Sequence, residues 1–186
     1  MIRAFIALEL PGELRAAIGE VQDQLRRSAA GGKVTWTKPE NLHLTLQFLG
    51  DIQEERVAGI VATLSRVAGH HARFPVAVGG VGAFPDGRLP RVLWAGCADP
   101  AGRLGALAEA VRAAGWGGAD REFAPHVTMG RIARPRPDAA LTRALDSLKD
   151  TACGTWVVDA VHLVRSELRP QGSVYTKLSS LPLKGD

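Results

Sequence analysis

Residues 42–48 decide how this chain folds, because apolar and polar side chains alternate there one by one. The stretch reads Leu42-His43-Leu44-Thr45-Leu46-Gln47-Phe48. Successive side chains of a β-strand point to opposite faces of the sheet, so the leucines and Phe48 are predicted to be buried. His43, Thr45 and Gln47 are predicted to share the other face. A rigid strand would thus present an imidazole and a hydroxyl side by side.

The same arrangement occurs a second time, in the other half of the chain. The stretch reads Pro125-His126-Val127-Thr128-Met129-Gly130-Arg131. His126 and Thr128 share one face of this predicted strand, and Val127 and Met129 take the opposite one. Two His-x-Thr triplets arise by chance in roughly one shuffled chain in forty, so the pair is informative where one copy is not. The alternative is two half-buried histidines hydrogen-bonded to threonines or to the backbone.

On both sides of these two stretches, the pattern predicts alternating strands and helices. Further strands are expected over 2–8, 73–84, 91–95, 155–164 and 174–181, and helices over 13–27, 54–67, 99–114 and 138–149. Many strands are half-polar and follow one another directly, which favours an α+β fold with largely antiparallel sheets. Each half contains one His-x-Thr strand followed by a helix, and no stretch between them has the composition of a flexible linker. We therefore expect two lobes of one unit.

Composition describes an ordinary globular protein with a mild excess of positive charge. The chain has 186 residues, of which 46% are hydrophobic and 23% charged, with a net charge of +4. The charge would suit a phosphate-bearing partner, although a solvated basic surface explains it equally well. The apolar start is too short for a signal peptide, and no apolar run reaches the ~18 residues of a membrane-spanning helix. Cys97 and Cys153 show no metal or disulfide spacing, so we expect free thiols and a cytoplasmic location.

A pair of histidines matches the opening of a cyclic phosphodiester. Water must lose a proton as it attacks phosphorus, and the departing ribose oxygen must gain one. A neutral histidine can do the first and a protonated histidine the second, both near neutral pH. The two threonine hydroxyls would donate to the non-bridging oxygens, whose charge grows in the transition state. No acidic cluster accompanies the histidines, so we expect neither a metal nor another cofactor.

Sequence segments around the two motifs resemble those of a known family. They are residues 39–50, Phe84-Pro85, residues 90–94, residues 123–128, and Ser166-Glu167-Leu168 leading to Val174-Tyr175. From about Ile2 to Leu183 the chain resembles the 2H phosphoesterase superfamily and, within it, the bacterial LigT-like RNA 2′,3′-cyclic phosphodiesterases. The resemblance implies a single domain over residues 1–186, made of two interleaved, pseudo-symmetric lobes around a central cleft. Helices would cover the outer faces.

The resemblance also implies a role for each motif residue. His43 is expected to protonate the leaving 3′ oxygen and His126 to activate water, which leaves a 2′-phosphate. Thr45 and Thr128 would hold the phosphate.

Two more residues are expected to bind substrate, although alternation places both on the wrong face. The resemblance implies that Arg131 contacts the phosphate and that Phe48 stacks on a base. Arg131 has the opposite strand parity to His126, so it reaches the cleft only if the strand ends or bulges near Gly130. Alternation alone would bury Phe48. For Phe48, a place in the core and a place in the cleft both remain open at this point.

The expected partners follow from the same resemblance. They are RNA with a 2′,3′-cyclic phosphate end, including tRNA fragments, and cyclic nucleotides. We expect a monomer without a membrane partner. Two alternative functions remain open: 2′–5′ ligation of tRNA halves at the same site, and a module that binds RNA ends without turning them over. Outside the motifs, His162 is expected to be structural, and Tyr175 to lie near the ligand.

Overall fold

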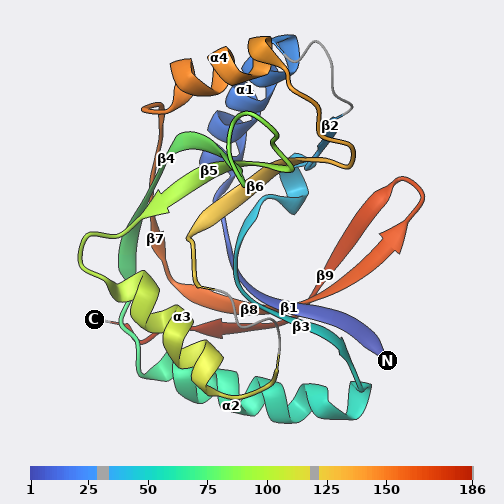
Figure 1. Cartoon of the computed structure of the whole chain (residues 1–186). Coiled ribbons are helices and arrows are strands. Elements are labelled where there is room, and N and C mark those ends of the chain that lie inside the picture. The colour runs from blue at the N-terminus through green and yellow to red at the C-terminus, as the bar shows by residue number, and fades with distance from the viewer. Residues whose placement is uncertain (29–33, 118–121, 186) are drawn as a thin grey trace.

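The computed structural model describes residues 1–28, 34–117 and 122–185 (Figure 1). The strands are β1 (Ile2–Glu9), β2 (Val34–Trp36), β3 (His43–Ile52), β4 (Phe74–Phe84), β5 (Val92–Ala98), β6 (His126–Ile132), β7 (Ala152–Val158), β8 (Ala160–Arg169) and β9 (Gly172–Pro182). The helices are α1 (Gly12–Ser28), α2 (Val57–Gly69), α3 (Arg103–Ala113) and α4 (Ala139–Leu148), with short 3-10 turns η1 (Pro39–Asn41) and η2 (Glu54–Arg56).

All of these strands belong to one curled sheet with the order β7-β4-β5-β6-β3-β1-β8-β9, in which β2 pairs with β6. Neighbouring strands are antiparallel throughout. We call β2, β4–β7, α1 and α4 the upper lobe, and β1, β3, β8, β9, α2 and α3 the lower lobe, as they lie in Figure 1. The fold is α+β, as the half-polar strand pattern predicts.

The two His-x-Thr strands meet where the lobes join. Strands β3 and β6 pair at a single position, Leu44 opposite Val127, and both side chains are fully buried. Each of these residues is the central one of its His-x-Thr triplet. The seam between the lobes therefore brings the two motifs side by side.

Helices cover the outer faces of the curled sheet. Helices α1 and α4 pack on each other and on β7 and β4 of the upper lobe, whereas α2 and α3 pack on β8, β9 and β3 of the lower lobe (Figure 1). Each helix is amphipathic; in α1 the buried stripe includes Leu14, Ile18 and Leu25 at helical spacing. Within the described ranges, no helix is long and apolar enough to cross a membrane.

The predicted strand over 155–164 is wrong in one respect, because the structure has two strands there. Strand β7 ends at Val158 and pairs with β4 in the upper lobe, and β8 begins at Ala160 and pairs with β1 and β9 in the lower lobe. The chain changes lobe at Asp159. Apolar alternation continues through this crossing because both strands bury one face, and the local pattern carries no information about which strand is the partner.

The glycines of β4 allow close packing against the neighbouring strand. Strand β4 bulges against β5 between Gly79 and Val81. A Cβ atom on Gly82 would collide with the indole ring of Trp94 on β5. Glycine at this position therefore lets the large ring lie across the neighbouring strand.

Candidate active site

Backbone carbonyls two residues upstream orient both motif histidines. Nδ1 of His43 lies 2.7 Å from the carbonyl oxygen of Asn41, and Nδ1 of His126 lies 2.7 Å from that of Ala124. A carbonyl oxygen only accepts hydrogen bonds, so we assign the proton in each ring to Nδ1. In each ring Nε2 is then the nitrogen that can exchange a proton. Nε2 of His43 lies 3.0 Å from Oγ1 of Thr45, its motif partner.

Aromatic rings hold the two imidazoles in place. Phe5 stacks on His43 with ring centroids 4.8 Å apart, and the ring of Tyr175 meets His43 edge-on at 5.3 Å. Phe84 meets His126 edge-on at 5.1 Å. The alternation pattern did not assign Phe5 or Phe84 to the site, although Phe84-Pro85 is one of the segments that carry the family resemblance. Both lie in apolar strands, and nothing in the local pattern shows that a ring in such a strand faces the site instead of the core.

The charges of Arg131 and His126 act on His43. The pKa of His43 lies below its usual range, chiefly because the ring is buried; the hydrogen bond to Asn41 opposes this shift. The positive charges of Arg131 and His126 lower the pKa of His43 further. The lower-lobe histidine therefore lies within electrostatic reach of both upper-lobe groups, as one shared site requires.

A β-bulge turns Arg131 onto the face of His126. Trp94 of β5 pairs with Thr128, but the preceding residue, Leu93, pairs with Gly130, so Met129 is an extra residue in β6. The bulge reverses the strand parity after Met129. Arg131 is exposed and returns to the side of His126 and Thr128. The condition set by the alternation is thus met.

A matching bulge in β3 overturns what alternation predicts for Phe48 and Gln47. Ala7 pairs with Thr45 and Ile6 with Gln47, so Leu46 is the extra residue. Phe48 lies opposite Phe5, 6.1 Å away between ring centroids, and is 56% exposed, so the prediction that buries it is wrong. The prediction that Gln47 shares the face of His43 is wrong for the same reason. The amide of Gln47 turns away and donates to the carbonyl of Gly117 at 2.7 Å.

The two motifs are therefore similar over more than the His-x-Thr triplet. In each strand the bulge falls on the third residue after the histidine, and the fifth residue after the histidine turns back to the histidine's face. That residue is Phe48 in the lower lobe and Arg131 in the upper lobe. The pseudo-symmetric site thus carries an aromatic ring on one side and a guanidinium on the other.

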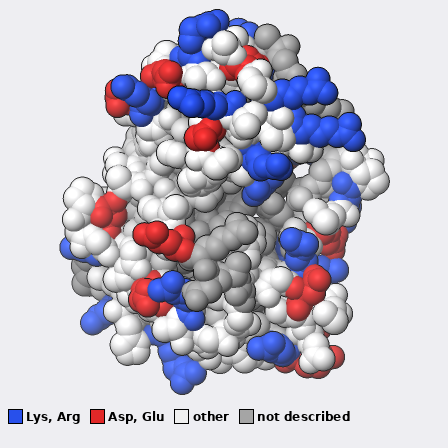
Figure 2. Space-filling model, in the orientation of Figure 1, with Lys and Arg blue, Asp and Glu red and all other residues white. Residues whose placement is uncertain are grey.

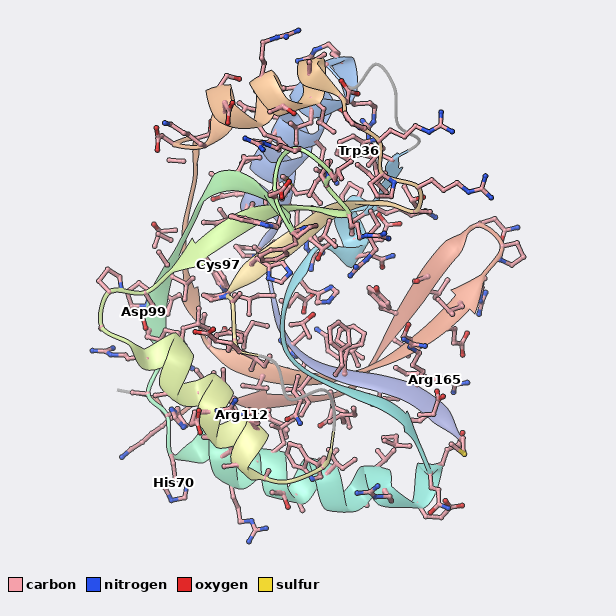
Figure 3. All side chains as sticks on the ribbon, viewed as in Figure 1. Trp36, His70, Cys97, Asp99, Arg112 and Arg165 are labelled. Atoms are coloured by element: carbon pink, nitrogen blue, oxygen red, sulfur yellow. The ribbon has the colours of Figure 1, made fainter. Side chains whose placement is uncertain are left out.

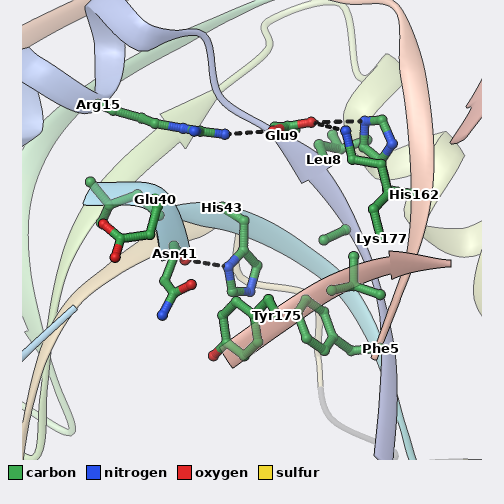
Figure 4. A pocket seen from close by; sticks show the side chains of 13 residues that line it. Phe5, Leu8, Glu9, Arg15, Glu40, Asn41, His43, His162, Tyr175 and Lys177 are labelled. Atoms are coloured by element: carbon green, nitrogen blue, oxygen red, sulfur yellow. Dashed lines mark hydrogen bonds and ion pairs between the residues drawn. The ribbon is translucent and has the colours of Figure 1, made fainter. Parts of the chain in front are cut away.

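A cavity of about 110 Å³ lies beside His43 (Figure 4). Phe5 and Tyr175 form part of its wall, so Tyr175 lies near the candidate site as expected. At the polar end, Glu9 pairs with Lys177 and, at 2.7 Å, with Arg15. The hydrogen bond from Lys177 is the main cause that lowers the pKa of Glu9; partial burial opposes it and Arg15 adds to it.

His162 also lines this cavity, and it is only 7% exposed. Nε2 of His162 lies 3.9 Å from a carboxylate oxygen of Glu9. Burial is the main cause that lowers the pKa of His162. The ring is therefore buried and at the same time lines the cavity beside His43.

Positive charge is concentrated on one side of the hollow between the lobes. Figure 2 shows Lys and Arg side chains gathered on the upper lobe, above this hollow. On the face that Figure 2 shows, positive side chains therefore gather mostly on the lobe that carries Arg131. Within the described ranges, no three His, Cys, Asp or Glu side chains lie close enough to hold a metal ion.

Comparison with known proteins agrees with this arrangement. Residues 8–94 and 96–175 match the family model described as LigT like phosphoesterase. A protein of Thermus thermophilus named RNA 2′,3′-cyclic phosphodiesterase is 38% identical, over 100% of this chain and 92% of its own length. One of the same name from Methanothermobacter thermautotrophicus is 33% identical, over 95% and 96%. The crystal structure of a Thermus thermophilus protein matches with a TM-score of 0.82 and 35% identity over 100% of both chains.

The similarity thus extends through both motif strands and through both lobes. The chain belongs to the family of LigT like phosphoesterases.

Proposed function

We propose that this protein is an RNA 2′,3′-cyclic phosphodiesterase that opens the cyclic end of RNA to a 2′-phosphomonoester without a metal ion. One observation carries the proposal: two imidazoles from different lobes, each oriented by a carbonyl 2.7 Å from Nδ1, flank the pair formed by Leu44 and Val127. The names of the full-length relatives at 33% and 38% identity support the same activity.

The two histidines divide the proton transfers between them. Nε2 of His126 accepts a proton from water while the water oxygen forms a bond to phosphorus. The bond from phosphorus to O3′ breaks, and Nε2–H of His43 gives its proton to O3′. The phosphate stays on O2′. At the end of the turnover His126 is protonated and His43 neutral, and exchange with solvent restores both.

Other side chains would hold the charge and the base. The hydroxyls of Thr45 and Thr128 donate to the non-bridging oxygens, and the Arg131 guanidinium binds the same oxygens as their charge grows. Phe48 presents an exposed ring beside Phe5. The terminal base stacks on the ring of Phe48.

Substrate binding would also prepare His43 for its role as the acid. Burial and the charge of Arg131 hold the pKa of His43 low in the free protein, so the neutral ring is favoured there. A phosphodiester carries a negative charge and, once bound beside the ring, raises the pKa again. His43 therefore takes up its proton as the anion binds, which couples substrate binding to the protonation that the reaction needs.

The decisive experiment is product analysis on an oligonucleotide with a 2′,3′-cyclic phosphate end, in excess EDTA. We expect a 2′-phosphate from the wild-type protein. His43→Ala and His126→Ala should each slow turnover about 10²–10⁴-fold, as loss of general acid or base catalysis does. His70→Ala is the matched control, because His70 is exposed at the end of α2.

Three outcomes would contradict the proposal. Full activity of His126→Ala would end the assigned mechanism. A 3′-phosphate product would show that the other ribose oxygen leaves. Tight binding of the RNA end without any product would favour the binding module over the enzyme.

We further propose that residues 1–186 act as one domain, as a monomer in the cytoplasm. The sheet continues from lobe to lobe through β6 and β3, and each lobe supplies one histidine. Cys97 and Cys153 are free thiols, as expected in a reducing compartment. Sedimentation equilibrium tests whether the protein is a monomer. Fractionation of the producing cells tests whether it is located in the cytoplasm.

A further inference from the structure

A buried amide on α1 joins the two segments that lead to the site. Gln22 is 3% exposed, and among the described residues only it and His162 are buried polar side chains. Its Nε2 donates to the carbonyl oxygens of Thr37 and Met129, each at 2.8 Å. A buried amide is costly unless it is hydrogen-bonded, so these two carbonyls determine where the side chain lies.

One of these carbonyls belongs to the bulge that aims Arg131. Met129 is the extra residue of β6, and an extra residue is left out of the regular ladder with its neighbouring strand. Its carbonyl needs donors from elsewhere. The backbone N–H of Thr37 donates to it at 2.9 Å, and Gln22 supplies the second donor. Gln22 thus stabilises the bulged form of the strand.

The next residue shows how tightly the bulge is packed. A Cβ atom on Gly130 would lie 2.8 Å from Cγ1 of Val34 and 3.2 Å from the ring of Trp36 on β2. Trp36, labelled in Figure 3, is itself covered by Arg26 of α1, whose guanidinium lies 5.0 Å from the ring. Helix α1 and β2 therefore enclose the bulge, and Arg131 lies two residues after Met129.

The other carbonyl leads toward His43. Thr37 is followed by η1, and the last residue of η1, Asn41, offers the carbonyl that orients His43. The amide of Gln22 therefore ties this segment to β6 at the point where both approach the site. Gln22 acts more directly on Arg131 than on His43, because Met129 lies only two residues from Arg131.

We propose that Gln22 is a positioning residue: it holds the Met129 bulge, and through the bulge it aims Arg131 at the phosphate. The inference rests on the proposed function, since it takes Arg131 as the phosphate ligand. Gln22 itself does not touch the substrate. Its replacement should therefore weaken phosphate binding only as far as Arg131 is misplaced.

The test is a double-mutant cycle in the full chain. Gln22→Met keeps the volume and removes both hydrogen bonds; Arg131→Gln removes the charge. A misplacement of about 1 Å can cost about 10²-fold, so we expect Gln22→Met to lower kcat/KM about 10- to 100-fold and to weaken inhibition by a nucleoside 2′-phosphate. The double variant should be no slower than Arg131→Gln alone, because no guanidinium remains to be positioned. Losses that multiply would overturn the proposal.

Two further variants separate positioning from general stability. Ile18→Val, one turn away on the buried face of α1, should lower Tm and leave kcat/KM and product inhibition unchanged. If Gln22→Met does not fold, Gly130→Ala disturbs the same bulge from the β2 side, and its loss should likewise vanish in the Arg131→Gln background. A loss that persists there overturns the proposal. Wild-type kinetics in Gln22→Met, with His43→Ala inactive, would refute the role of Gln22 and leave the phosphodiesterase intact.

Discussion

Replacing Phe48 with alanine separates a base-stacking ring from a core ring. The side chain is 56% exposed and lies beside Phe5 on the face of His43. Truncating a fully buried phenylalanine costs about 3–5 kcal/mol, so a ring less than half covered should cost about 1–2 kcal/mol of folding stability. For a chain of this length, we expect Tm to fall by about 2–8 °C.

The effect on catalysis should depend on the base. Loss of base–aromatic stacking costs about 1–3 kcal/mol per base, which lowers kcat/KM about 5- to 150-fold for a nucleoside 2′,3′-cyclic phosphate. A methyl riboside 2′,3′-cyclic phosphate carries the same phosphate and no base. Phe48→Ala should therefore open it at the wild-type rate.

The assay compares kcat/KM of both substrates for the wild-type protein and Phe48→Ala, alongside thermal melts. Phe74→Ala is the matched control, because Phe74 is fully buried at the start of β4 and its loss should cost the full core penalty. Equal losses of kcat/KM on both substrates would refute the stacking role. A fall in Tm as large as that of Phe74→Ala would show that the ring packs as core.

Three further outcomes are expected. His43 must be protonated to act as the acid, and its pKa is lowered by burial and by the charge of Arg131, which moves the high-pH limb of the kcat/KM profile to lower pH. Arg131→Gln should therefore move that limb to higher pH while the rate falls. A limb that does not move would contradict the assignment of His43 as the acid. Burial raises the pKa of Cys97 to about 12, so iodoacetamide at pH 8 should label this thiol only after unfolding. Rapid labelling of the folded protein would contradict the burial of Cys97. Asp138 caps α4 by accepting hydrogen bonds from the N–H groups of Ala140 and Leu141. Asp138→Ala should therefore lower the free energy of unfolding by about 0.5–2 kcal/mol and leave kcat/KM unchanged. An unaltered melting curve would refute the capping role.

The site chemistry was readable from the sequence because it depends on short-range alternation. His43 and Thr45, and likewise His126 and Thr128, are two residues apart, and no bulge falls between them. The strand period alone therefore places each pair on one face. The α+β class with antiparallel strands also followed from half-polar strands in direct succession. Both are local properties, which a linear pattern can carry.

Alternation failed where a bulge altered its period. The extra residues Leu46 and Met129 bring Phe48 and Arg131 to the site and turn Gln47 away from it. A bulge is stabilised by groups distant in the sequence, such as Gln22, which lies 107 residues from Met129. Its position therefore depends on packing between elements.

Tertiary structure also decided which strands became partners. The residue order alone shows that two imidazole–hydroxyl pairs exist and that a strand displays each of them. Only the fold determined that β3 and β6 join at Leu44 and Val127, and that the chain changes lobe at Asp159. The physical reason is that a strand's own pattern specifies which face it buries, whereas its neighbour is selected by the packing of the whole sheet and of the helices that cover it.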